Sequence, residues 1–310
     1  MTVITNTALT FSTIGQREDL LDVIFTISPT DTVFSSTIGT STANAVYHEW
    51  QTDTLQAAGA NAQLEGNDYS SFTAVTPTQR VGNRCQISSK DVVVSGTLDA
   101  VDKAGRVREL VYQLRKKSNE IKRDIEFVLT NNQAPVTGSS SVARQLRPLC
   151  GWYQTNANRG AGGANGTASA SATDGTQRPV TEAMLKTMIQ SCWVNGGTPD
   201  LIMCGPTQKV NISAFTGNAT RFDQSEDKKL VAAIDVYVSD FGEHKIVANR
   251  FQRDRDLHVL DTSLWATAYL RPLQSISLAK TGDAEKAILQ AEYTLEARNE
   301  AGSGIIADLS

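Results

Sequence analysis

The side chains that most often carry catalysis are few and scattered in this sequence of 310 residues. The three histidines are His48, His244 and His258, and none lies at a spacing that pairs it with a nucleophile or a metal. The sequence has no Gly-x-Ser-x-Gly turn, no Walker loop and no His-Glu-x-x-His helix, the arrangements that position such chemistry. We therefore interpret His48 as a strand surface residue, His244 as a turn residue and His258 as a strand residue facing away from the core. We predict no catalytic residue.

The thiols and clustered carboxylates also lack the spacing of a metal site. Asp254, Asp256 and Asp261 alternate with arginines and do not follow the calcium-loop pattern. The four cysteines form no Cys-x-x-Cys pair, which favours buried apolar groups in a reducing compartment. They are Cys85, Cys150, Cys192 and Cys204. We predict no metal ligand and no cofactor.

Glycine is concentrated between Gly160 and Gly166, but its spacing fits neither a dinucleotide-binding loop nor a Walker loop. The surrounding residues 155–178 are rich in Gly, Ala, Ser, Thr and Asn, which predicts a flexible surface loop. An α/β enzyme that closes this loop as a lid is the alternative from a different functional class.

The elements that would have to position any site are dominated by a proline-free stretch from Leu98 to Asn131. Apolar residues recur in it at spacings of three, four and seven, which predicts one continuous amphipathic helix with Thr97 as a possible N-cap. At 1.5 Å per residue this helix would be about 50 Å long. We expect a helix of this length to support the other elements.

Two long strands, residues 44–53 and 78–95, are predicted before this helix, with a poorly apolar tip at residues 57–68. A two-stranded ribbon with so little apolar surface is not stable alone. We therefore expect it to project from the body and to lie on a neighbouring subunit, which buries the region of Trp50.

The rest of the chain predicts an extended arm, a small α/β unit and returning strands. Thr181 caps a helix that ends before Gly196–Gly197, and Gly205–Pro206 opens a second helix after a short buried strand. The predicted later strands are residues 233–238, 245–249, 257–260, 266–278 and 287–298.

Charge and hydropathy exclude several functional classes. The net charge of −4 and the isoelectric point near 5.5 do not favour a general nucleic-acid-binding protein. The basic residues Arg115, Lys116 and Lys122 are interleaved with acidic ones, which favours a solvated helix face, with a contact between subunits as the second interpretation. No run of 18 apolar residues and no secretory leader is present, so we expect folding in a cytoplasm without a membrane partner.

A set of short segments, in this order and spacing, resembles the major capsid (head) proteins of tailed bacteriophages, in the branch found in podoviruses and prophages. The resemblance covers about residues 15 to 308. The segments are His48–Asp53, Glu65–Gly66, Thr76–Asn83, Gln86–Ile87, Val94–Thr97, Lys122–Glu126, Gly242, Gly282–Asp283, Glu292–Leu295 and Asn299–Glu300.

The resemblance implies an α+β fold of the HK97-like class. Its parts would be an N-terminal arm (1–31), an extended β-ribbon or E-loop (32–95), a peripheral domain with a long spine helix (96–147 and 285–310) and an axial α/β domain (148–284). Neither a Lys–Asn pair for an isopeptide cross-link nor a long charged prodomain can be assigned.

The implied function is structural: self-assembly into hexamers and pentamers of an icosahedral head enclosing double-stranded DNA. An encapsulin-like compartment shell is the alternative within the same fold. Expected partners are further copies, scaffold, portal and decoration proteins, and weakly bound DNA, in a virion assembled in the bacterial cytoplasm. The predicted assembly interface comprises His48, Glu49, Trp50, Arg80, Arg115, Lys116 and Lys122.

Overall fold

The computed structural model describes residues 28–68, 72, 74–103, 105, 108–215 and 235–310. Most of the predicted arm, residues 1–27, therefore lies outside the described residues, as does the polar stretch 216–234. The described chain begins its regular structure with the short helix α1 (Val33–Thr37). None of the described helices is both long enough and apolar enough to span a membrane.

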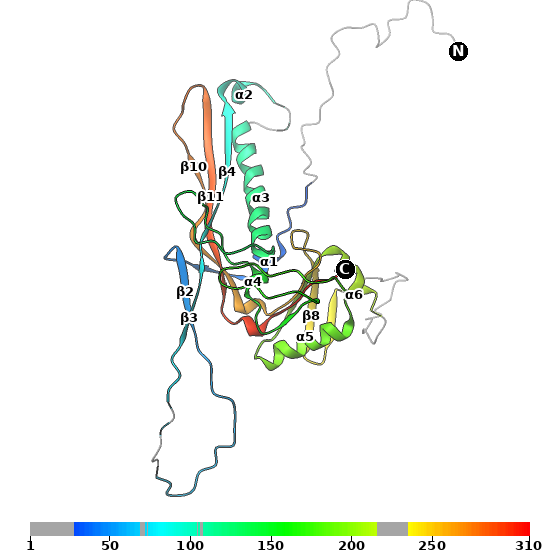
Figure 1. Cartoon of the computed structure of the whole chain (residues 1–310). Coiled ribbons are helices and arrows are strands. Elements are labelled where there is room, and N and C mark those ends of the chain that lie inside the picture. Colours follow the sequence, from blue (N-terminus) through cyan, green and yellow to red (C-terminus); the bar gives the residue numbers. More distant parts are fainter. Residues whose placement is uncertain (1–27, 69–71, 73, 104, 106–107, 216–234) are drawn as a thin grey trace, which may run out of the picture.

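A four-stranded sheet and one long helix form the upper part of the molecule in Figure 1. The strand order is β1 (Gly39–Thr42), β10 (Trp265–Ser277), β11 (Ala284–Ala297) and β4 (Gln86–Ser95). β10 and β11 form a long antiparallel hairpin, β4 pairs antiparallel with β11, and β1 runs parallel to β10. Helix α3 (Glu109–Thr130) lies along this sheet.

The prediction of one continuous helix from residue 98 to 131 is wrong. Helix α2 (Gly96–Ala100) ends first and α3 begins only after an interruption, with Gly105 at a positive φ of 73° between them. The carboxylate of Asp99, a residue of α2, accepts a hydrogen bond from the Glu109 N–H at 2.9 Å and pairs with Arg108. Asp99 therefore caps the N-terminus of α3. The spine helix is therefore 22 residues, or about 33 Å, long. The N-cap of α2 is Ser95, whose side chain accepts from the Leu98 N–H, and not Thr97.

The second sheet has six strands and belongs to the small α/β unit. Its order is β5 (Ala157–Asn158), β12 (Gly304–Ile306), β9 (Leu257–Leu260), β6 (Leu201–Cys204), β8 (Gly242–Ala248) and β7 (Val236–Ser239). The central strands β6 and β9 are buried at every position. Helices α5 (Glu182–Val194) and α6 (Pro206–Ser213) pack against this sheet (Figure 1).

Several local predictions for this unit are confirmed. The Thr181 side chain accepts a hydrogen bond from the Met184 N–H and caps α5, Gly196 follows the helix at a positive φ, and Pro206 is the first residue of α6. Of the predicted later strands, residues 257–260 have the same bounds as β9, and the strands 266–278 and 287–298 correspond to β10 and β11.

The third sheet is the two-stranded ribbon of β2 (Tyr47–Thr52) and β3 (Gln79–Arg84). The predicted second strand, 78–95, divides at Cys85, so that β3 pairs with β2 while β4 joins the four-stranded sheet. The reason is local: the Cys85 N–H donates to the Val46 carbonyl at 2.8 Å, and its side chain is buried against Ala43 and Ala268. The described residues of the connection between β2 and β3, 53–68, 72 and 74–78, project far from the body (Figure 1) and are called the ribbon loop below.

The glycine-rich segment 155–178 has many exposed residues and little regular structure, as expected of a surface loop, but parts of it pair with the body. Strand β5 pairs with β12, and Ala164 forms a bridge with Thr173. The buried Asp308 carboxylate accepts a hydrogen bond from the Gly160 N–H at 3.0 Å. A Cβ at Gly160 would collide with the Thr176 carbonyl oxygen, so this glycine permits close backbone packing.

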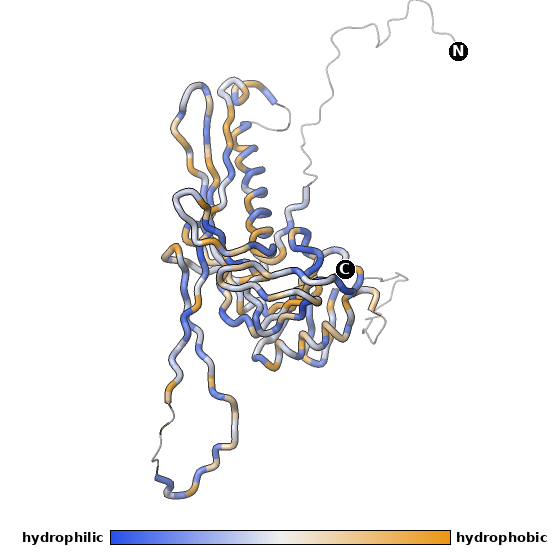
Figure 2. The backbone as a smooth tube through the Cα atoms, in the orientation of Figure 1, coloured by the Kyte–Doolittle hydropathy of each residue, from blue (hydrophilic) through white to orange (hydrophobic). Residues whose placement is uncertain are grey.

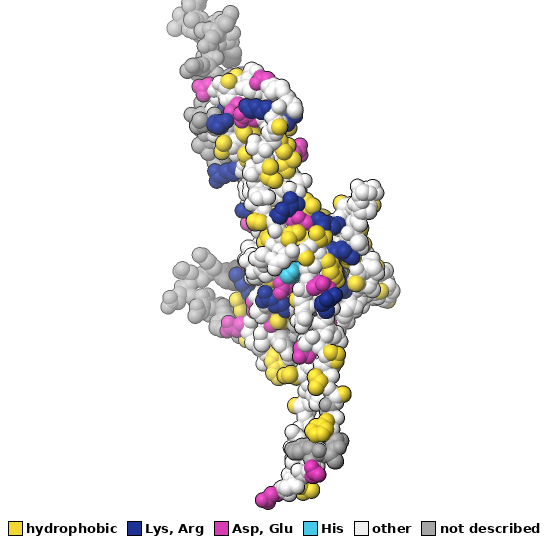
Figure 3. Space-filling view, turned by 90° about the vertical axis from the view of Figure 1, so that its left-hand side faces the viewer, with side chains coloured by type: hydrophobic (Ala, Val, Ile, Leu, Met, Phe, Trp, Pro, Cys, Tyr) yellow, Lys and Arg dark blue, Asp and Glu magenta, His cyan; other side chains and the backbone are white. Residues whose placement is uncertain are grey.

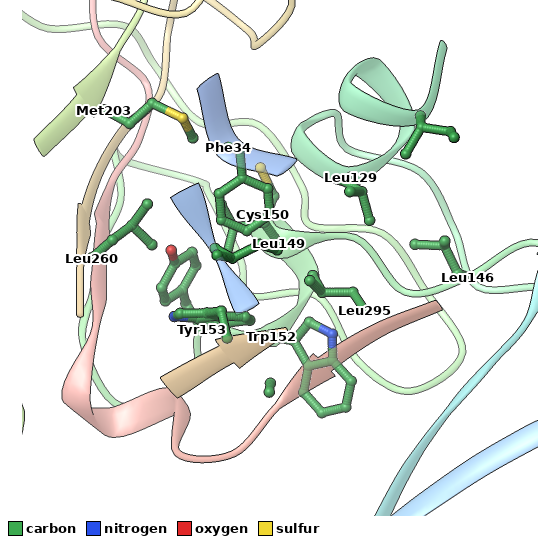
Figure 4. Packing of buried hydrophobic residues seen from close by; sticks show 14 of the residues in the cluster. Phe34, Leu129, Leu146, Leu149, Cys150, Trp152, Tyr153, Met203, Leu260 and Leu295 are labelled. Carbon is green, nitrogen blue, oxygen red and sulfur yellow. The ribbon is translucent and has the colours of Figure 1, made fainter. Parts of the chain in front are cut away.

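The main core lies where α1, α3, the short helix α4 (Leu149–Trp152) and both larger sheets meet (Figure 4). Along α3, apolar and polar residues alternate in the hydropathy view of Figure 2, and the residues spaced by four, Ile121, Ile125 and Leu129, are buried. A second cluster fills the space between α5 and the six-stranded sheet.

We expect Leu129→Ala to lower the free energy of unfolding by about 2–5 kcal/mol, because Leu129 is fully buried and its removal leaves a cavity. Val111→Ala is the matched control on the same helix, since Val111 is more than half exposed, and it should change stability by less than about 0.5 kcal/mol. Urea unfolding of the unassembled subunit measures both. Equal effects of the two substitutions would contradict the assigned buried face of α3.

Candidate assembly surfaces

The base of the ribbon is fixed to its own subunit by two side chains. The Trp50 indole N–H donates to the Ala297 carbonyl at 2.9 Å, and its ring lies 5.6 Å from the ring of Trp152. The Asn83 amide, which is buried, donates to the Leu295 carbonyl at 2.9 Å. The end of β11 and the core around α4 therefore cover part of the Trp50 side chain within its own subunit, and burial of the region around it by a neighbouring copy stays a prediction.

Four of the predicted interface residues lie together at this base. His48 and Trp50 are on β2 with their rings 5.7 Å apart, and the His48 Nε2 lies 3.5 Å from the Glu296 carboxylate. On the other face of the strand, Glu49 pairs with Arg80 of β3 at 2.9 Å. Arg80 is largely exposed, so this face is open for contact with another molecule. That these residues contact a neighbouring copy stays a prediction.

The other three predicted interface residues lie on α3 and are not brought to the ribbon. Arg115, Lys116 and Lys122 are exposed. Their neighbour Lys117 is paired with Glu120 at 2.7 Å, while within the described residues none of the three exposed residues has an acidic partner at ion-pair distance. They form a second, separate group of cationic side chains on the spine helix.

The feature that the sequence interpretation missed is the apolar content of the ribbon loop. Four large apolar side chains stand almost fully in solvent: Leu55 (97% exposed), Leu64 (83%), Phe72 (88%) and Val75 (92%). Figure 3 shows apolar side chains spread along this projecting part. In the sequence these side chains are isolated apolar residues in a segment without strand or helix periodicity, and this pattern is the signal that could have identified them. Such side chains, held far from any core, indicate a surface that another molecule covers.

A smaller apolar surface lies at the end of the α/β unit. Trp193 at the end of α5 is about half exposed and its ring lies 5.3 Å from that of Phe241, in the turn between β7 and β8. Val194 beside it is also exposed.

The groups that could perform chemistry are buried instead of lining a cleft. His258, predicted to face away from the core, is fully buried between Tyr153, whose ring it stacks on, and Cys150, whose sulfur is 3.9 Å from Nε2. Burial lowers the pKa of His258 to about 3, so the ring is neutral. His244, predicted in a turn, is buried in β8 and contacts the Pro199 carbonyl through Nδ1. Strand β9 is buried on both faces, so none of its side chains reaches solvent. The alternation of polar and apolar residues therefore gives the wrong position for His258.

All four cysteines are buried and free, as the sequence predicts. Burial raises the pKa of Cys192 and of Cys204 to about 12, so neither thiol is a ready nucleophile. The carboxylate of Asp256 is tied to Arg253 at 3.6 Å, and within the described ranges no cluster of three His, Cys, Asp or Glu side chains is arranged to hold a metal ion.

Comparison with known proteins gives a consistent result along the whole length. The family model described as SU10 major capsid protein matches residues 3–310. The chain is 28% identical to the major capsid protein of Escherichia phage Phieco32 over 331 residues, which covers 94% of each protein.

Solved structures show the same fold at low sequence identity. The chain is similar to the capsid of the native GTA particle, with a TM-score of 0.65, 10% identity, and coverage of 97% of this chain and 98% of that one. It is also similar to a chain from phage G major capsid proteins with their decoration proteins, with a TM-score of 0.54, 10% identity and full coverage of both chains.

Proposed function

The chain belongs to the family of SU10 major capsid proteins, and we propose that its copies assemble as hexamers and pentamers into an icosahedral head that encloses double-stranded DNA. It is a structural component of a phage virion with the HK97-like fold, and not an enzyme. The family and the curated relative are phage capsid proteins, so they give no support to an encapsulin-like compartment. The motif order from His48–Asp53 to Asn299–Glu300 supports a place in the podovirus and prophage branch.

The observation that carries this proposal is the ribbon loop. It projects from the body with Leu55, Leu64, Phe72 and Val75 exposed, while Trp50 and Asn83 tie its base to the end of β11 by hydrogen bonds. The anchored base sets the direction in which the loop projects. Its exposed apolar side chains can then be buried against another molecule. We propose that the loop lies on the next copy in the shell and that His48, Glu49 and Arg80 contact that copy near the base.

The proposed division into parts follows the strand pairing. The arm is 1–31 and the ribbon lies within 32–95, followed by peripheral and axial domains built on the four-stranded and six-stranded sheets. We propose a peripheral domain of residues 96–147 and 285–310 and an axial domain of residues 148–284. The strand pairing supports a shift of these bounds, because β10, which begins at Trp265, pairs in the four-stranded sheet, and β12, which begins at Gly304, pairs in the six-stranded sheet.

Other partners are proposed by analogy. A phage G structure similar to this chain includes decoration proteins, and we propose that scaffold, portal and decoration proteins contact this shell too. Assembly takes place in the bacterial cytoplasm.

Electron microscopy and sedimentation of the expressed protein test the proposed function. We expect closed shells, or free hexamers and pentamers. A monodisperse monomer at every concentration would contradict self-assembly.

We expect the shell to bind duplex DNA weakly and without sequence preference, because the net charge is −4. A Kd of roughly 10⁻⁴ to 10⁻⁶ M at physiological salt is expected. The triple variant Arg115→Gln, Lys116→Gln, Lys122→Gln should reduce the dependence on salt if α3 faces the genome. Fluorescence anisotropy with a labelled duplex measures this, and nanomolar binding would contradict it.

A further inference from the structure

A buried carboxylate joins three parts of the molecule that are far apart in the sequence. Glu126 lies near the end of α3, and its side chain is fully buried. Its Oε1 accepts hydrogen bonds from the Phe34 N–H and from the Asn249 amide, both at 2.7 Å, and its Oε2 accepts from the Ser35 N–H at 2.8 Å. Within the described residues no cation is paired with it, so these donors alone compensate the burial of its charge.

Two of the donors are backbone amides in the first turn of α1, the helix that follows the arm. Thr32, the N-cap of α1, makes no capping hydrogen bond with its side chain. The amides of Phe34 and Ser35, which such a cap would satisfy, both donate to Glu126 instead. The Phe34 ring is buried in the main core. Helix α1 is therefore held both by the Phe34 side chain and by the two backbone amides that donate to Glu126.

The third donor ties this junction to the six-stranded sheet. Asn249 directly follows β8, is fully buried, and donates its backbone N–H to the Cys204 carbonyl at the end of β6. Glu126 therefore links α1, the spine helix and the axial sheet through one side chain.

The residue type suits this role because three donors converge on it. A carboxylate only accepts hydrogen bonds, whereas a glutamine amide has a donor on one side. In either orientation of its amide, the variant Glu126→Gln would present an N–H₂ group to another N–H donor.

We propose that Glu126 is the positioning residue that fixes where the N-terminal arm leaves the body, and that shell assembly depends on it through the arm. This inference rests on the proposed function, since it requires that the arm contributes to contacts between copies. Glu126 acts on assembly by holding α1, the element from which the arm departs.

The test compares Glu126→Gln with Glu120→Gln in the full chain. Glu120 lies on the same helix but is partly exposed and paired with Lys117, so it is the matched control. We expect Glu126→Gln to lower hydrogen-exchange protection of the Phe34 and Ser35 amides by about tenfold or more and to reduce particle yield. Glu120→Gln should do neither.

A second comparison separates positioning of the arm from general loss of stability. In a chain without residues 1–28, Glu126→Gln should cause no additional loss of particles, because the arm on which it acts is absent. An additional loss there would overturn the proposal, as would normal particle yield from Glu126→Gln in the full chain or failure of that variant to fold by circular dichroism.

If removal of residues 1–28 alone leaves particle yield unchanged, the arm has no role in assembly and the proposal fails. The proposed shell function would then still stand, because particles form.

Discussion

Replacing the four exposed apolar side chains of the ribbon loop with serine should abolish particle formation while leaving the subunit folded. The variant is Leu55→Ser, Leu64→Ser, Phe72→Ser and Val75→Ser. Full burial of one such side chain contributes about 1.5–3 kcal/mol, so each copy would lose the main apolar contact that its loop offers to a neighbour. Within its own subunit these side chains are exposed, and their loss should not change stability.

The control for this variant lies in the same loop. Gln56→Ser and Gln63→Ser alter exposed polar side chains and should leave particle yield unchanged. Circular dichroism and thermal unfolding verify the fold, and negative-stain electron microscopy counts particles. Normal shells from the fourfold serine variant would show that the loop is not an assembly contact.

The sequence predicts the individual helices and strands of this fold better than the breaks and connections between them. The 3.6-residue period of α3 and the cap at Thr181 are local features, and both are present in the structure. The break before α3 depends on a contact between residues that are ten positions apart, because the Asp99 carboxylate caps α3 by accepting a hydrogen bond from the Glu109 N–H. Gly105 was its single sequence signal, and one glycine is compatible with a helix.

The surfaces show the same contrast. Trp50 could be predicted to need a partner, but only the folded chain shows that the Ala297 carbonyl and Trp152 supply much of it. The sequence predicts a poorly apolar tip at residues 57–68, yet the few apolar residues in and beside it matter because the fold leaves them nothing to pack on. Exposure is a property of the whole structure, so composition alone could not identify these side chains as a candidate contact surface.

Deleting residues 1–28 should lower particle yield by about tenfold or more, because loss of about 1.4 kcal/mol of contact per copy already changes an association constant tenfold. The sequence of the arm has one short apolar cluster, at residues 20–24, which is too little for a core of its own. The described elements all begin after residue 32, so the body keeps every helix, strand and core cluster and should unfold at the same urea concentration as the full chain.

The matching control retains the arm but removes its apolar cluster, as Leu20→Ser, Leu21→Ser, Val23→Ser and Ile24→Ser. If the arm acts through these side chains, this variant should assemble as poorly as the deletion. If it assembles normally while the deletion does not, the arm acts through its backbone or polar groups. Shells from the deleted chain in normal yield would remove the arm from the assembly mechanism and leave the ribbon loop as the principal contact.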